Sequence, residues 1–361
     1  MSMVKLKEIK KLFIALKKHL PTFPSFFYLF IINFNSFEGD MKKKILIITT
    51  GGTIAMKFEK DKGVVPSNDL VDFLHSFTGI KAIADIHIYE FSNIPSPHIT
   101  PQMMFELAKF VDSTMVHYDG AVITHGTDTV EETAFMLDLV LTTRMPVVFT
   151  AAMRSGNELG LDGPRNIIGA VRVAAHSNSI DRGVLVVMND EIHTARDVVK
   201  VDTGRIDSFE SPGYGAIGYV DTDDVIYHRQ ILFRESVWTD KIDPAVDLIK
   251  ATAGMSDLYV EASINNGAHG IVFEAFGRGN LPPYIIPSIQ KAIENKIAIV
   301  IVSRTYTGRV MPEYGYSGGC KNLLEMGVML GGDLRGPKAR IKLMCLLGKY
   351  VDLDMVKKFI I

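Results

Sequence analysis

Cysteine is rare in this chain of 361 residues, and neither sign of charge is in excess. The two cysteines, Cys320 and Cys345, are too few for a disulfide framework and lack the spacing of a metal site. We therefore expect both to be buried apolar residues. The 39 basic and 41 acidic residues leave a formal net charge of -2, so electrostatics give no reason to expect a nucleic-acid partner.

Long hydrophobic runs, internal repeats and low-complexity tracts are also absent. No stretch approaches the ~18 consecutive apolar residues of a membrane-spanning helix, so we expect no membrane insertion. The hydrophobic content of 47% is nevertheless enough for a large core. Because single cores rarely grow beyond ~250–300 residues, the length favours two domains.

Residues 1–40 differ in composition from the rest. Met1–Leu20 carries six lysines against one glutamate, and Phe26–Ile32 is a short apolar run. This order resembles a secretory leader, although the small residues of a cleavage site are missing. The alternative, which we favour, is an upstream extension, because Met41 followed by three lysines leads directly into a predicted strand. We expect residues 1–40 to lie outside the fold and the protein to be cytoplasmic, or secreted or periplasmic if they form a leader.

From Met41 onward, short apolar runs alternate with amphipathic stretches. The predicted strands of the first set are Lys44–Thr50, Ile83–Phe91, Gly120–Thr124, Pro146–Ala151 and Gly183–Met188. The predicted helices between them are Asn68–Phe77, Pro101–Thr114, Val130–Leu141 and Arg165–Ala175. Near-continuous apolar strands separated by helices indicate a mostly parallel sheet with both faces covered. Asn189–Ala195 is expected to be a polar turn, and Gly213–Val225 turn and hairpin material.

A second, shorter α/β set follows a break at Ser236–Pro244. Its predicted strands are Val246–Thr252, Gly270–Phe276 and Ala298–Ser303, and its helices are Leu258–Asn265, Pro283–Asn295 and a last one at Lys338–Leu347. We therefore predict two α/β domains of unequal size. Residues 41–235 form the larger, catalytic one with a mixed, mostly parallel sheet, 236–250 a linker, and 251–361 a smaller parallel-sheet domain.

The most informative local pattern is a glycine-rich turn directly behind the first predicted strand. Gly51 and Gly52 allow the backbone to turn sharply and to approach a ligand closely. A plain turn would explain the glycines alone, and a phosphate-binding loop is disfavoured because no P-loop lysine follows. Thr53 comes next, so its hydroxyl would be presented at the open end of the sheet, where nucleophilic chemistry requires it.

A second polar turn follows the strand at Gly120–Thr124. Thr127 and Asp128 stand where the next helix begins, with Glu131 and Glu132 in its first turn. Helix capping would explain one of these polar side chains, but not several in a row after a buried strand. His125 is expected to be a structural histidine without a catalytic role.

A threonine hydroxyl is almost entirely protonated at neutral pH and needs an activating group. No Ser-His-Asp set is evident, but a lysine held beside an acid could relay a proton. Lys200, downstream of the strand at Gly183–Met188, is a candidate. From the residues alone, a solvated surface lysine is the default interpretation.

These residues resemble the bacterial-type L-asparaginases strongly. Thr50–Ala55 and Thr124–Thr133 look like the two signature motifs of that family. The resemblance continues through Ala152–Arg154, Asp162–Pro164, Gly183–Asp190, Arg196–Lys200, Gly277–Leu281 and Pro337–Arg340, and so spans roughly Lys43 to the C-terminus.

The resemblance implies hydrolysis of L-asparagine to aspartate and ammonia, possible use of L-glutamine, and no metal or organic cofactor. It implies that Thr53 forms an acyl-enzyme and that Thr127, Asp128 and Lys200 position and activate the attacking group. Asp128 would also bind the substrate ammonium, and Ser96 its α-carboxylate. Backbone donors near Thr53, Thr127 and Ala152 would hold the oxyanion.

The resemblance further implies a homotetramer, built as a dimer of dimers, in which Asn280 completes the neighbouring subunit's site. Two departures stand out. Many members carry a tyrosine in the loop after the first motif, where this chain has Val64, so Tyr314 or Tyr316 of a partner, or the Lys200 set, would have to compensate. Pro97 follows Ser96 and cannot donate an N–H to the carboxylate. Glu313 is a candidate acid for the neighbouring site.

Three alternatives stay open on the sequence alone. The chain could relate to the amidotransferase subunit of transfer-RNA-dependent synthesis, although residues 1–40 do not make that subunit's extra domain. It could also be a non-catalytic amino-acid-binding or regulatory protein, which the missing loop tyrosine favours slightly. A nucleotide-binding α/β protein comes last.

Overall fold

The structure is a computed structural model that describes residues 42–67, 74, 78–232 and 234–360. The chain divides into two units, Met1–Lys42 and Lys43–Ile361, and the second contains both sheets described below. The interpretations of residues 1–40 lie outside the described residues, as does nearly all of the helix predicted at Asn68–Phe77. A short helix, α4 (Thr78–Ile83), follows that region.

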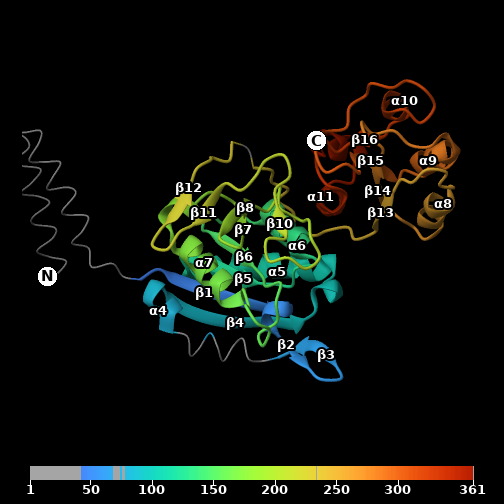
Figure 1. Cartoon of the computed structure of the whole chain (residues 1–361). Helices are drawn as coiled ribbons and strands as arrows, with labels where there is room; N and C mark the ends of the chain where they lie inside the picture. The colour runs from blue at the N-terminus through green and yellow to red at the C-terminus, as the bar shows by residue number, and fades with distance from the viewer. Residues whose placement is uncertain (1–41, 68–73, 75–77, 233, 361) are drawn as a thin grey trace, which may run out of the picture. The chain divides into compact units, whose positions relative to one another are not determined.

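The larger sheet has eight strands in the order β12-β11-β8-β7-β6-β5-β1-β4 (Figure 1). Five of them are parallel: β1 (Lys44–Gly51), β4 (Asp85–Ile94), β5 (Gly120–Thr124), β6 (Val147–Thr150) and β7 (Val184–Met188). The other three are antiparallel to their neighbours: β8 (Glu191–Thr194), β11 (Gly218–Val220) and β12 (Val225–Tyr227). The mixed, mostly parallel sheet that the sequence predicts is confirmed.

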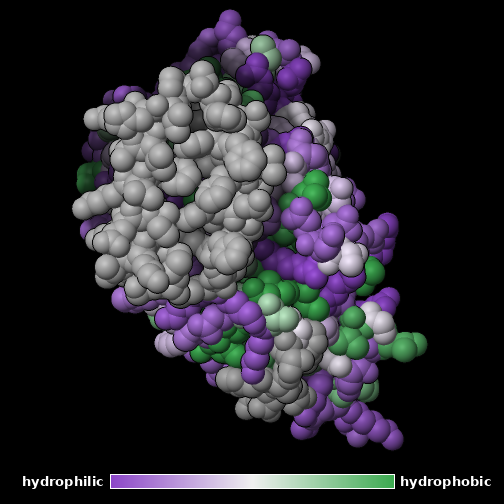
Figure 2. Space-filling model, turned by 90° about the vertical axis from the view of Figure 1, so that its left-hand side faces the viewer, coloured by the Kyte–Doolittle hydropathy of each residue, from purple (hydrophilic) through white to green (hydrophobic). Residues whose placement is uncertain are grey.

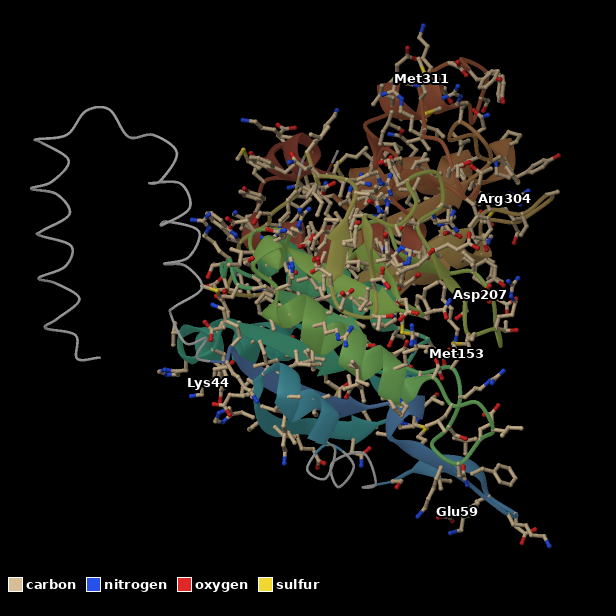
Figure 3. The ribbon with its side chains drawn as sticks, turned by 60° about the vertical axis from the view of Figure 1, so that its left-hand side comes forward. Lys44, Glu59, Met153, Asp207, Arg304 and Met311 are labelled. Carbon is tan, nitrogen blue, oxygen red and sulfur yellow. The ribbon has the colours of Figure 1, made fainter. Side chains whose placement is uncertain are left out.

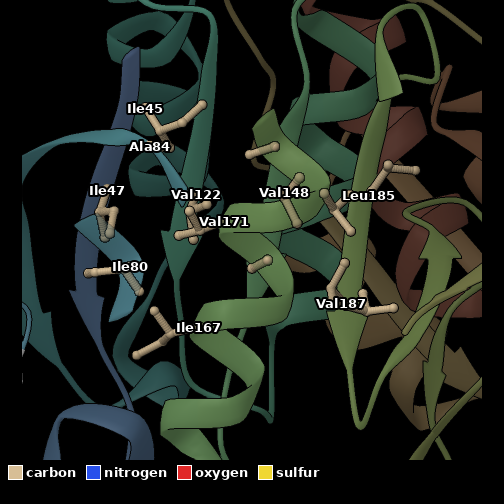
Figure 4. Packing of buried hydrophobic residues seen from close by; sticks show 14 of the residues in the cluster. Ile45, Ile47, Ile80, Ala84, Val122, Val148, Ile167, Val171, Leu185 and Val187 are labelled. Carbon is tan, nitrogen blue, oxygen red and sulfur yellow. The ribbon is translucent and has the colours of Figure 1, made fainter. Parts of the chain in front are cut away.

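Helices cover both faces of this sheet because successive strand residues point to opposite sides. On one face, Ile45 and Ile47 pack with residues of α4 and α7 (Gly163–Ala175), as Figure 4 shows. On the other, Leu46 and Ile48 pack with residues of α5 (Pro101–Thr114) and α6 (Val130–Val140). β1 is therefore buried from both sides, which explains its continuous apolar sequence.

The smaller sheet is entirely parallel, in the order β13-β14-β15-β16. Its strands are β13 (Val246–Lys250), β14 (Gly270–Ala275), β15 (Ala298–Ser303) and β16 (Met329–Leu330). Figure 1 shows α8 (Leu258–Asn265) and α9 (Ile286–Glu294) on one side and α11 (Gly336–Lys349) on the other. The short helix α10 (Cys320–Glu325) also belongs to this domain. Two α/β domains are thus confirmed, whereas the exact limits proposed for them stay a prediction.

Helix α11 ties the smaller sheet to the larger one. Its Ile341 and Met344 share a core with Phe135 and Met136 of α6 and with Val272 of β14. Both cysteines are buried, as predicted: Cys345 lies in this core and Cys320 begins α10.

Three local predictions are wrong. Asn189–Ala195 is not only a turn, since β8 pairs antiparallel with β7 across Asn189 and Asp190, whose positive φ angles of 49° and 65° suit a tight hairpin. A second hairpin, β2 (Met56–Glu59) with β3 (Gly63–Pro66), occupies a segment expected to be a loop. A final helix, α12 (Leu353–Phe359), follows the helix predicted to be last.

The short elements that complete the fold are single turns or two-residue pairs. They are η1 (Thr53–Ala55), η2 (Ser96–His98), η3 (Met115–His117), η4 (Ser177–Ser179), η5 (Pro283–Ile285), β9 (Val199–Lys200) and β10 (Phe209–Glu210). Within the described part of the chain, no helix is long and apolar enough to cross a membrane. On the face in Figure 2, the described hydrophobic residues form separate patches among hydrophilic ones.

Candidate active site

The first glycine-rich turn can form only with glycine. Gly51 and Gly52 have φ angles of 104° and 80°, in the region that favours glycine. A Cβ on Gly51 would stand 2.4 Å from the backbone N and O of Ile94. The turn is therefore pressed against the end of β4, and it delivers Thr53 to the start of η1.

The second turn touches the first through backbone atoms. A Cβ on Gly52 would lie 2.3 Å from both Cα and N of Gly126. Thr53 follows Gly52 directly, and Thr127 follows Gly126. Each threonine is therefore the next residue after this contact, at the carboxyl ends of β1 and β5. Figure 3 agrees: Lys44, at the start of β1, lies at one end of the sheet, and Glu59 and Met153, from segments after β1 and β6, lie toward the other.

Lys200 reaches both polar residues of the second turn. Its Nζ donates to Thr127 Oγ1 at 2.9 Å and to Asp128 Oδ1 at 2.6 Å. Thr127 is buried, whereas the side chain of Asp128 is 57% exposed and that of Lys200 only 19%. One carboxylate oxygen of Asp128 is thus held by the amine, while the open side of the group can meet a ligand.

Ser96 lies against the same turn. Its hydroxyl, which is buried, accepts a hydrogen bond from the backbone N–H of Asp128 at 3.3 Å. The Thr129 hydroxyl donates to the carbonyl of Ser96 at 2.9 Å, and a Cβ on Gly126 would stand 2.5 Å from Ser96 Oγ. The Ser96 hydroxyl therefore keeps its own proton available for donation to a ligand.

Ala152 begins a third segment at this edge, after β6. Asp162 holds it by accepting from the backbone N–H groups of Met153 and Arg154 at 3.0 and 3.1 Å. A Cβ on Gly163 would meet both Ala152 Cβ, at 3.5 Å, and Ile54 Cγ1, at 3.2 Å. Gly163 is thus a neighbour both of the buried Ala152 and of Ile54, the residue after Thr53. The segment at Ala152 therefore lies beside the turn that carries Thr53.

The acidic residues after the second turn do not act as simple caps. Thr129 is the N-cap residue of α6 but makes no side-chain capping bond, because its hydroxyl points to Ser96. Glu131 accepts a hydrogen bond from the backbone N–H of Lys200 at 3.0 Å. Burial, together with repulsion from Glu131, raises the pKa of Glu132. The sequence placed both acids in this turn but could not assign Glu131 a distant partner.

His125 is completely buried and bonds through Nδ1 to the carbonyl of Gly126 at 2.8 Å. Burial lowers its pKa to about 4, with the backbone bond opposing the shift. The imidazole is therefore neutral at neutral pH. Burial agrees with the structural histidine that the sequence predicts, although only one ring nitrogen is bonded: Nε2 is buried without a hydrogen-bond partner among the described residues.

Asn280 is not brought to the other candidates within this chain. Its Oδ1 accepts from the backbone N–H of Cys320 at 3.2 Å, beside the smaller sheet. Glu313 faces Arg278 at 3.6 Å, and the exposed rings of Tyr314 and Tyr316 lie 5.6 Å apart. These four side chains have their partners in the smaller domain, and among the described residues none of them bonds to Thr53, Thr127, Asp128 or Lys200.

The hairpin after the first turn presents apolar side chains where the family resemblance leads one to expect a tyrosine. Val64 pairs with Phe58 across the two strands, and both are about half exposed. The amide of Asn157 bonds the N–H and C=O of Phe58 at 2.8 and 2.9 Å, and so continues the strand pairing. The Thr53 hydroxyl has no hydrogen-bond partner among the described residues.

Thr127, Asp128 and Lys200 are therefore joined by hydrogen bonds at the carboxyl end of the larger sheet, and the turn that carries Thr53 touches the turn that carries Thr127. The arrangement offers an unpaired hydroxyl, an amine bonded to a second hydroxyl, and an exposed carboxylate. No group of three His, Cys, Asp or Glu side chains that could hold a metal ion occurs in the described segments. Such a set suits acyl transfer to a hydroxyl nucleophile.

Two family models match the chain. "Asparaginase, N-terminal" covers residues 44–233, and "Glutaminase/Asparaginase C-terminal domain" covers residues 245–360. Among known proteins, the chain is 36% identical to an L-asparaginase of Bacillus licheniformis, over 86% of this chain and 98% of that protein. It is 33% identical to L-asparaginase 2 of Escherichia coli, over 87% and 91%. It is also 31% identical to one component of the glutamyl-tRNA(Gln) amidotransferase of Methanosarcina mazei, over 85% of this chain but 74% of that protein.

Proposed function

The chain belongs to the asparaginase family, and we propose from this that it hydrolyses the side-chain amide of L-asparagine to L-aspartate and ammonia. The observation that carries the proposal is the pairing of Lys200 with Thr127 and Asp128 beside the turn that presents Thr53. L-glutamine, one methylene longer, is a possible second substrate. The proposed compartment is the cytoplasm, or the periplasm or exterior if residues 1–40 are a leader.

Thr53 is the proposed nucleophile because its hydroxyl is free among the described residues and stands at the open edge of the sheet. Its Oγ1 attacks the amide carbon, its proton passes to the leaving nitrogen, and ammonia departs from an acyl-enzyme ester. Water then adds to the ester, the bond to Oγ1 breaks, and aspartate leaves as Thr53 regains a proton. Lys200 and Thr127 would orient the attacking group and relay these protons.

An amino-acid substrate carries a cation and an anion that both need partners. The exposed carboxylate of Asp128 would bind the α-ammonium, and the Ser96 hydroxyl would donate to the α-carboxylate. Backbone N–H groups near Thr53, Thr127 and Ala152 would hold the developing oxyanion. Pro97 cannot add a backbone donor to the carboxylate site, so Ser96 would carry more of that binding.

We also propose that the protein assembles as a homotetramer of two dimers, in which Asn280 completes the site of a neighbouring subunit. The support is that the side chain of Asn280 bonds to the backbone of Cys320, in the smaller domain, rather than to the other proposed site residues of its own chain. In such an assembly, Tyr314, Tyr316 and Glu313 would approach the same neighbouring site.

A second candidate is amide hydrolysis that supplies ammonia for transfer-RNA-dependent synthesis. The similarity to the amidotransferase component of Methanosarcina mazei favours it, although the chain spans 74% of that protein against 98% of the Bacillus licheniformis relative. Non-catalytic amino-acid binding is a third interpretation, supported by Val64 in place of a loop tyrosine.

The test is ammonia release by the purified protein from L-asparagine and L-glutamine, beside Thr53→Ala. We expect turnover of asparagine by the native chain and a loss on the order of a thousandfold or more in the variant. The variant should still bind aspartate, measured by calorimetry, because the ammonium and carboxylate partners remain. Binding of asparagine by the native chain with no ammonia release would favour the non-catalytic interpretation.

A further inference from the structure

Helix α11 carries a lysine that is completely buried and belongs to no carboxylate pair within the described residues. Lys338, in the first turn of that helix, has no exposed surface. Its Nζ donates to three backbone carbonyls, those of Ala195, Arg196 and Val198, the first two at 2.8 Å. All three N–H bonds of the ammonium are therefore satisfied by main-chain oxygens of one short segment.

That segment leads directly to Lys200. It runs from the end of β8 to β9, which consists of Val199 and Lys200 only. The backbone N–H of Lys200 is held in turn by Glu131, at the start of α6. Lys338 of α11 thus bonds to the main chain before Lys200, and Glu131 of α6 bonds to the main chain of Lys200 itself.

A packing role alone does not explain a lysine at this position. A buried ammonium is costly, and a methionine of similar length would fill the same space. Burial lowers the pKa of Lys338 to about 8, while Glu131 and Asp197 favour the charged form and Arg196 and Arg335 oppose it. The amine therefore stays protonated at neutral pH, and it supplies three donors that no apolar residue could offer.

Removing Lys338 would leave three buried carbonyls without their donor. An unpaired buried polar group costs free energy, so the segment would move to find other partners. Because Lys200 follows within two residues of Val198, such movement would displace its amine from Thr127. A displacement of about 1 Å at a reacting group can lower a rate on the order of a hundredfold.

We propose that Lys338 is a positioning residue that sets the place of Lys200 by clamping the carbonyls of Ala195, Arg196 and Val198. The inference rests on the proposed function for its effect on rate, but the clamp itself is a property of the fold. In this arrangement the smaller sheet's helix takes part in forming the site of the same chain.

The test compares Lys338→Met with Lys342→Met. Lys342 lies one turn further along α11 and is also buried, but among the described residues it bonds to none of the three carbonyls. It pairs instead with Glu235 at 2.5 Å, and Glu235 in turn pairs with the Arg196 side chain at 3.3 Å. We expect both variants to melt at lower temperature, and kinetics are measured below both midpoints. Only Lys338→Met should lower kcat on the order of a hundredfold, with a much smaller change in KM. Lys338→Gln, which keeps two N–H donors, should fall between native and Met.

Amide hydrogen exchange of the peptide that covers residues 195–200 gives a second readout, independent of activity. Exchange should be much faster in Lys338→Met than in Lys342→Met, which loses no bond to the backbone of this peptide and reaches it only through Glu235 and the Arg196 side chain. Native kcat in Lys338→Met, an equal loss in Lys342→Met, or unchanged exchange would each overturn the inference. If Lys338→Met does not fold, the same outcomes apply to Lys338→Gln. If the native chain has no amidase activity, the proposed function fails, and exchange alone decides whether Lys338 is a clamp.

Discussion

Lys200 Nζ donates a hydrogen bond to Thr127 Oγ1 at 2.9 Å, although 73 residues separate the two in sequence. The contact joins β9, which follows the antiparallel strand β8, to the turn that follows the parallel strand β5. Thr127 is buried, so the amine meets it away from most solvent, and Asp128 adds a second acceptor at 2.6 Å. This contact distinguishes an organised site from a row of polar residues in separate loops.

Loss of the Lys200 amine should abolish most activity while the fold persists. We predict that Lys200→Met lowers kcat at least a hundredfold, because Thr127 and Asp128 lose the amine that bonds to both. A loss of this size is typical when one general acid or base is removed. The thermal midpoint should fall only modestly, because the Asp128 side chain is 57% exposed and water can solvate it once the amine is gone. Steady-state kinetics beside Lys357→Met, an exposed lysine of α12, provide the check. Equal rates in the two variants would rule out a role for Lys200.

Contact between the two turns should tolerate no side chain at Gly126. Its Cβ would stand 2.5 Å from Ser96 Oγ and 3.2 Å from Gly52 Cα. We predict that Gly126→Ala lowers the free energy of unfolding by about 1–3 kcal/mol, as overpacking does, and removes most turnover. Gly204→Ala is the matched control, since no atom lies within 4 Å of its added Cβ. Chemical denaturation of both variants would show whether only the first is affected.

Acid should weaken the fold through His125. Its pKa is about 4 in the folded protein, below the ordinary 6.5, because burial disfavours the imidazolium. Between those values the unfolded chain binds more protons, so stability present above pH 6.5 is lost as pH falls toward 4. The contribution is about 3 kcal/mol. We predict a steeper loss of unfolding free energy between pH 7 and 4 for the native protein than for His125→Gln, at one fixed protein concentration. Parallel curves for the two proteins would contradict this.

Sites shared between subunits should allow two inactive chains to restore each other. If Asn280 serves a neighbouring chain, Thr53→Ala and Asn280→Ala are each defective, but a mixed dimer contains one site with both residues intact. We predict that mixing the two variants under mild dissociating conditions recovers up to about a quarter of native activity, as random pairing of sites allows. No recovery, with subunit exchange shown by mass spectrometry, would place Asn280 outside the neighbouring site.

Local patterns were sufficient where the physics is local. The glycines at 51 and 52 marked a turn that only glycine can form, and the continuous apolar runs of β1 and β5 marked a buried parallel sheet. The β7–β8 hairpin escapes prediction because β8 is only four residues long and contains both a buried histidine and an exposed glutamate. Asn189 and Asp190 predict a turn, but they do not reveal the strand that follows it.

Strand periodicity and glycine chemistry predict the fold class and the two threonine-bearing turns, and the family is indicated by the resemblance of the motifs in those turns. These features act over a few neighbouring residues, so they can be recognised in the chain without its coordinates. Long-range contacts were needed to establish that Lys200 meets Thr127 rather than solvent, that Glu131 bonds to its backbone, and that Lys338 bonds to the backbone of the segment before it. Those contacts join α6, α11 and the segment before β9, which are far apart in sequence, and their energies depend on burial and geometry that no single stretch of chain contains.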